Sequence, residues 1–101
     1  MYPQYFQARR YDSPESNGVI IKLQESLLEI FTGDGLPAGF FLGVDSNGKL
    51  SVSQDYSYSS IGEETALRIR KEFLNSRTFR EYSIDRSKPS PFLPNRSEVM
   101  H

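Results

Sequence analysis

The chain has 101 residues, with 12 basic and 13 acidic side chains and a formal net charge of −1. It contains no cysteine, which excludes disulfides, cysteine-based zinc sites and thiol catalysis. Its one histidine is His101, so the usual serine–histidine and cysteine–histidine arrangements of nucleophilic catalysis are not expected.

The first twelve residues are unusually aromatic. Tyr2, Tyr5, Phe6 and Tyr11 lie among glutamine, alanine and arginine. Disordered tails rarely contain so many rings. We expect residues 4–11 to form a short strand or a packed arm.

Two interpretations compete for residues 19–31. The β-branched run Val19, Ile20 and Ile21 favours a strand. The apolar residues of the segment as a whole recur instead at helical spacing, with charged residues on the opposite side. Since Asn17 can cap such a helix and Gly33 can end it, we predict a helix here.

A hairpin is predicted next. Two apolar segments, 40–44 and 49–53, flank a turn that contains Asn47 and Gly48. Asparagine and glycine tolerate the positive φ angles of tight turns, so this pair is a strong hairpin signal.

The remaining elements follow in order. Residues 54–59 are predicted to be a loop of tyrosine and serine, and residues 61–75 a second helix opened by a capping box from Ser60 to Glu63. The spacing predicts that this helix buries five residues: Ala66, Leu67, Ile69, Phe73 and Leu74. Residues 78–84 alternate as a strand does, and the proline-containing stretch 87–101 is predicted to be a flexible tail.

Together these elements predict an α+β fold with a single domain over residues 1–86. Two helices would cover one face of a small antiparallel sheet, in a β-α-β-β-α-β order that matches the ferredoxin-like arrangement. If residues 1–12 are only an arm, three strands and two helices remain.

No constellation predicts catalysis, a cofactor or a metal. No carboxylate pair has a spacing that suggests acid–base chemistry, and the turn after Asp45 lacks the ligands and glycine of a calcium loop. No apolar stretch approaches the roughly 20 residues of a membrane-spanning helix, and the first residues do not resemble a signal peptide. We therefore expect a cytoplasmic, non-enzymatic protein without a membrane partner.

Two aromatic groups predict protein binding instead. Tyr56 and Tyr58 alternate with serines, a mixture typical of recognition surfaces. Tyr5, Phe6 and Tyr11 form the second group, and the basic residues Arg68, Lys71 and Arg77 would lie at the rim. The alternative is that several of these rings only cap the edge of the core.

The predicted function is a small protein-binding module that acts by occlusion or scaffolding, as an inhibitor, adaptor or accessory subunit. Small inhibitors from phages and mobile elements, including anti-CRISPR proteins, are of this size. The alternative is nucleic-acid binding through the basic second helix and the open sheet face. Residues 91–96 also fit P-x-x-P-x-R, a polyproline ligand pattern.

Overall fold

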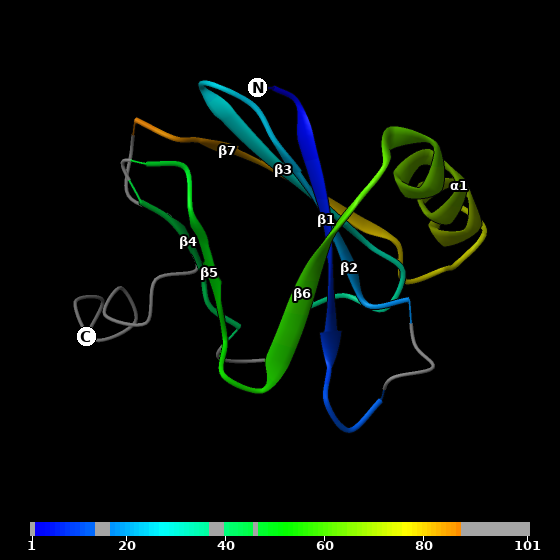
Figure 1. The fold of residues 1–101 in the computed structure, drawn as a ribbon. Coiled ribbons are helices and arrows are strands. Elements are labelled where there is room, and N and C mark those ends of the chain that lie inside the picture. Colours follow the sequence, from blue (N-terminus) through cyan, green and yellow to red (C-terminus); the bar gives the residue numbers. More distant parts are fainter. Residues whose placement is uncertain (1, 14–16, 37–39, 46, 88–101) are drawn as a thin grey trace, which may run out of the picture.

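A five-stranded antiparallel sheet lies between one helix and a two-stranded hairpin (Figure 1). The structure, a computed structural model, describes residues 2–13, 17–36, 40–45 and 47–87. The sheet contains β1 (Gln4–Arg10), β2 (Val19–Leu23), β3 (Leu27–Thr32), β6 (Tyr56–Ile61) and β7 (Arg80–Asp85), in the order β6-β1-β2-β3-β7. The hairpin is β4 (Leu42–Val44) with β5 (Leu50–Val52), and the helix is α1 (Glu63–Phe73).

The predicted helix over residues 19–31 is wrong. The segment forms the antiparallel strands β2 and β3, in register from Val19↔Thr32 to Leu23↔Leu28. Val19, Ile20 and Ile21 are all buried, because the hairpin covers one face of β2 and the helix covers the other. A strand buried on both faces has a continuous apolar sequence, so its β-branched residues were the better guide.

The predicted hairpin is confirmed. β4 and β5 pair through Gly43↔Ser51, and Gly48 in their turn has a φ of +80°. One oxygen of the Asp45 carboxylate accepts hydrogen bonds from the backbone N–H groups of Asn47 and Lys49, each at 2.8 Å. The side chain of Asp45 therefore fixes the turn in the way an Asx-turn does.

The predicted tyrosine–serine loop is largely a strand. Only Gln54 and Asp55 form the turn, and β6 runs from Tyr56 into the helix.

The second predicted helix is confirmed as α1, but the predicted capping box is wrong. Gly62, and not Ser60, is the N-cap residue, and no side chain makes a capping hydrogen bond.

Two apolar clusters hold the layers together. The hairpin-side core lies between the sheet and β4–β5, and the helix-side core lies between the sheet and α1. The helix-side core contains Tyr5, Ile20, Phe31, Ala66, Ile69 and Phe73. Leu67 and Leu74, which were predicted to be buried with them, are 52% and 51% exposed, so that prediction is wrong. Each follows a buried residue, Ala66 or Phe73, by one position, a rotation of about 100° around the helix, and so points away from the sheet.

The fold is thus α+β, with one helix rather than two on the sheet, and it does not have a clear ferredoxin topology. β1 is confirmed as a strand and lies between β6 and β2. The final strand is confirmed as β7. Residues 88–101, which include most of the predicted tail and its P-x-x-P-x-R pattern, lie outside the described residues.

Candidate interaction surface

The predicted tyrosines divide into buried and exposed residues. Tyr5 is 6% exposed and Tyr56 is 8% exposed, whereas Tyr58 is 36% and Tyr11 68% exposed. The Tyr5 ring belongs to the helix-side core, and its hydroxyl donates to a Glu63 carboxylate oxygen at 3.3 Å. Tyr5 and Tyr56 are thus part of the packed fold, and of these four tyrosines Tyr11 and Tyr58 are the ones exposed to a partner.

Aromatic rings on the hairpin side of the sheet pack edge to face. Phe40 meets Tyr56 with ring centroids 5.3 Å apart, and Phe6 meets Tyr58 at 5.8 Å, both with an interplanar angle of 80°. This geometry is favourable for aromatic pairs. Phe6 is therefore a half-buried support for Tyr58 rather than a separate contact residue.

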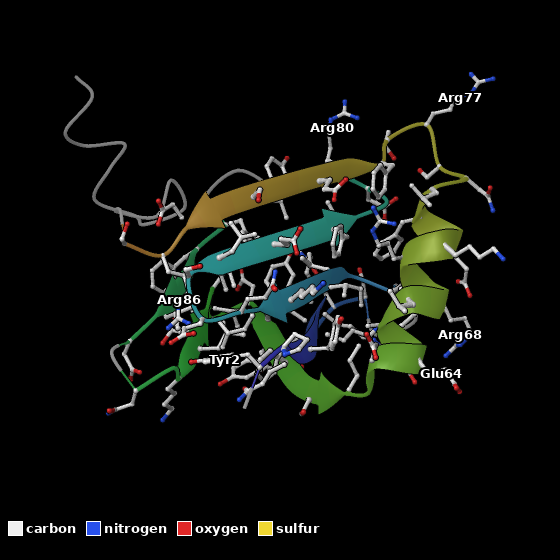
Figure 2. The ribbon with its side chains drawn as sticks, turned by 90° about the horizontal axis from the view of Figure 1, so that it is seen from above. Tyr2, Glu64, Arg68, Arg77, Arg80 and Arg86 are labelled. Atoms are coloured by element: carbon white, nitrogen blue, oxygen red, sulfur yellow. The ribbon has the colours of Figure 1, made fainter. Side chains whose placement is uncertain are left out.

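The predicted basic rim does not lie beside these tyrosines. Arg68 and Lys71 are on α1, while the side chain of Tyr58 lies on the opposite, hairpin-covered face of the sheet. Figure 2 shows Arg68 and Arg77 at the helix end of the molecule, pointing outward. Arg68 pairs with Glu72 at 3.6 Å, as i,i+4 partners on a helix do.

An exposed, uncharged strip runs along β6. We define the edge surface as Tyr11, Ser57, Tyr58, Ser59 and Ser60, all exposed. A shallow groove between β5 and β6 continues it and is lined by Ser51, Ser53, Tyr11 and Tyr58 among others. These serines were predicted to belong to a recognition loop, and what that prediction missed is that they belong to an outer strand of the sheet. The Tyr-Ser-Tyr-Ser alternation was the signal that could have identified the strand.

Tyr11 is held at one end of this surface by backbone and charge. Its N–H donates to the Asp55 carbonyl at 3.0 Å, and its neighbour Arg10 forms two hydrogen bonds to Asp12, at 3.0 and 3.1 Å. The hydrogen bond from Arg10 lowers the pKa of the Asp12 carboxyl, and the same bond raises the pKa of Arg10. The pair is exposed, so it orders the turn more than it stabilises the fold.

A second depression lies between α1 and the sheet. This helix-side groove has a volume of about 210 Å³ and is lined by Ile20, Phe31, Leu67 and four charged residues. The charges are matched, because Lys22 lies 3.9 Å from Glu29 and Arg70 lies 3.5 Å from Glu81. Arg70 also stacks 4.7 Å from the centroid of the Phe31 ring.

The helix-side groove is therefore better explained as a contact between α1 and the sheet than as a ligand-binding pocket. Its volume is below the roughly 300 Å³ at which small-molecule pockets begin. The Arg70–Glu81 ion pair links α1 to β7, and the stacking of Arg70 on Phe31 links α1 to β3, which fixes the helix on the sheet; the Lys22–Glu29 pair joins β2 to β3. The residues described include no group of three or more acidic, histidine or cysteine side chains placed to hold a metal ion.

Within the ranges that the structure covers, no helix has the length and apolar character to cross a membrane. No protein-family model, no curated protein and no solved structure matches this chain.

Proposed function

We propose that this chain is a small non-enzymatic module that binds another protein through the edge surface, and acts by occluding or scaffolding that partner. One observation carries the proposal. β6 and β7 are the two outer strands of the sheet, and only β7 carries charge.

The two outer strands differ in how they are protected from chance pairing. Natural proteins protect outer strands from chance pairing with charged residues, prolines or bulges. β7 has three charged residues among its six, Arg80, Glu81 and Asp85. β6 has the sequence Tyr-Ser-Tyr-Ser-Ser-Ile and lacks both charge and proline. An outer strand without such protection is expected where the cell supplies a partner.

The side chains of the edge surface suit a protein partner. Tyrosine provides a large, amphipathic contact area with little loss of conformational entropy, and serine adapts to the polar groups opposite. Tyr58 is already held by Phe6 and by a hydrogen bond from its hydroxyl to the Leu50 carbonyl at 2.9 Å. Pre-ordering of this kind reduces the entropic cost of binding.

Nucleic-acid binding has less support. Of the basic residues that suggested it, Arg68 and Arg70 form ion pairs with Glu72 and Glu81. The face of the sheet that was expected to be open is covered by the hairpin.

A matched pair of charge insertions tests the proposal. Ser59→Lys places a charge on β6, and Ser83→Lys places the same charge on the already charged β7; both serines are exposed. Proteins captured from a host lysate by the wild type and by Ser83→Lys, and lost with Ser59→Lys, are the expected result. Unchanged capture by Ser59→Lys would show that the edge surface is not the binding site.

Tyr11→Ala provides a second arm that leaves β6 intact. Tyr11 is the most exposed ring of the surface, so its removal is expected to weaken capture without lowering stability. Tyr56→Ala is unsuitable for this purpose, because Tyr56 belongs to the hairpin-side core.

A further inference from the structure

The outer edge of β6 has a backbone pattern that specifies how a partner can bind. We infer that the partner contributes an extended, uncharged segment, which pairs with β6 as an additional strand of the sheet. This inference rests on the proposed function and specifies its binding mode.

The direction of the backbone groups follows from two hydrogen bonds. The Tyr11 N–H donates to the Asp55 carbonyl, so residues 55, 57 and 59 direct their N–H and C=O groups toward β1. The Tyr56 N–H donates to the Ser53 carbonyl, on the side away from β1. Residues 56, 58 and 60 therefore direct their N–H and C=O groups outward. The turn uses the Tyr56 N–H, which leaves Tyr58 and Ser60 as the residues that present both an N–H and a C=O group at the edge.

β5 does not occupy this edge. It belongs to a separate sheet, and Figure 1 shows β5 and β6 diverging from their shared turn. The contact between them at Tyr58 is made by its side chain, whose hydroxyl reaches the Leu50 carbonyl on the hairpin-covered face. On the side of β6 away from β1, none of the described strands pairs with Tyr58 or Ser60. A new strand can therefore be added there, in the plane of the sheet.

The side chains along the edge indicate the chemistry of the added segment. Ser57 and Ser59 are small, exposed and uncharged, and they lie on the face opposite Tyr58. Cross-strand neighbours on one face interact directly, so bulky uncharged residues opposite these serines would gain the most contact. Backbone hydrogen bonds would supply affinity, and these alternating positions would supply specificity.

A second copy of this chain fits the edge less well. An antiparallel β6–β6 pairing would match Tyr58 with Ser60 twice, and would place serines beside serines. Two such edges would present mainly serine side chains to each other and would gain little side-chain contact. We therefore assign the site to a segment of another protein.

The test uses proline as a probe of the outer backbone. Ser60→Pro removes an outward N–H, places the proline ring at the edge and leaves the pairing with β1 intact, since edge strands tolerate proline at such positions. Ser60→Ala changes the side chain alone, and Ser83→Pro makes the same backbone change on β7, where residues 81, 83 and 85 face outward. Circular dichroism and urea unfolding check that each variant is folded.

The ligand is a peptide selected on the wild-type protein from a displayed random library, and its dissociation constant is measured by calorimetry. Ser60→Pro is expected to weaken binding by about tenfold or more, through the lost hydrogen bond and the blocked edge. Ser60→Ala and Ser83→Pro should remain within about twofold of wild type, the scale expected of surface substitutions. Equal binding by Ser60→Pro and wild type would overturn strand addition, as would a selection that enriches no uncharged segment.

A measurement on the unmodified protein removes dependence on the proline variant. Amide hydrogen exchange by NMR should show new protection at Tyr58 and Ser60 when the peptide binds, with Ser83 unchanged. The absence of that protection would overturn strand addition. A concentration-dependent dimer, seen by sedimentation and abolished by Ser60→Pro, would replace the external partner with a second copy.

The two proposals fail in different ways. If Ser59→Lys abolishes partner capture while Ser60→Pro binds normally, protein binding stands and strand addition is wrong. If neither variant changes binding, both proposals are wrong.

Discussion

Gly18 precedes β2 in a conformation that a side chain can hardly adopt. Its φ is +68°, and a Cβ added there would lie 2.0 Å from the carbonyl oxygen of Ala8. Gly18→Ala therefore combines two costs. The left-handed backbone costs about 1–2 kcal/mol for alanine, and the overlap must be relieved by moving Ala8, which pairs with Val19 on one side and Tyr58 on the other.

Gly35 provides the matched control. Its φ is +75°, but a Cβ there would meet nothing within 4 Å, so Gly35→Ala bears the backbone cost alone. We expect Gly35→Ala to lower the free energy of unfolding by about 1–2 kcal/mol. Gly18→Ala should lower it by about 3 kcal/mol or more, a large part of the roughly 5–15 kcal/mol that stabilises a domain.

Urea unfolding followed by far-ultraviolet circular dichroism measures both values. With a slope of about 1–3 kcal/mol per molar urea, a difference near 2 kcal/mol between the variants separates their midpoints by roughly 1 M. Equal destabilisation by the two substitutions would refute the steric argument, because it would mean that the chain relieves the contact with Ala8 at no cost.

Three further predictions concern stability. Burial raises the pKa of Tyr56 above its ordinary 10.0, so above pH 10 the unfolded chain loses the phenol proton more readily than the folded chain does. The wild type should therefore lose stability relative to Tyr56→Phe as the pH rises above 10, and unfolding at pH 9 and at pH 11 measures this. Ile69→Ala should cost about 2–5 kcal/mol and Leu67→Ala about 0.5 kcal/mol, because only Ile69 is buried; similar losses in thermal unfolding would contradict the observed face of α1. Asp45→Ala should cost about 1 kcal/mol by removing the acceptor of two turn hydrogen bonds, and an unchanged melting temperature would argue against that role.

Local signals in the sequence identified the elements that depend on local chemistry. The Asn47–Gly48 turn, the helix that contains Ala66 and Ile69, and the alternating last strand were all predicted near their observed positions. Each has a feature within a few residues that favours one structure: positive φ at a turn, helical spacing of apolar residues, or strict alternation.

The central strands could not be assigned in the same way. β2 and β3 are buried on both faces, so Ile20 and Ile21 are both apolar although they point in opposite directions. Their turn, 24–26, contains no glycine, proline or asparagine. Without alternation or turn chemistry, only the β-branched residues indicated strands, and they were outweighed by the helical spacing of the apolar residues and by Asn17 and Gly33 as helix ends.

The candidate surface was predicted by composition but not by geometry. The sequence grouped Tyr11 and Tyr58, which are exposed, with Tyr5 and Tyr56, which are buried. Which tyrosine of an alternating pair points inward depends on what lies above and below the strand. That information comes from the hairpin and the helix, which are distant in sequence from β1.

The position of β1 has a consequence for how the chain acquires its fold. β1 pairs with β2 across a short connection, but its other neighbour is β6, with Tyr5 opposite Ile61. During synthesis, the β1-β2-β3 meander emerges before β6 and β7. Until then, the outer edges of β1 and β3 have no paired strand. Contacts between residues so remote form slowly, and exposed strands invite aggregation in the interval. We therefore expect a nascent chain stalled before residue 56 to be far more aggregation-prone than one that has released β6.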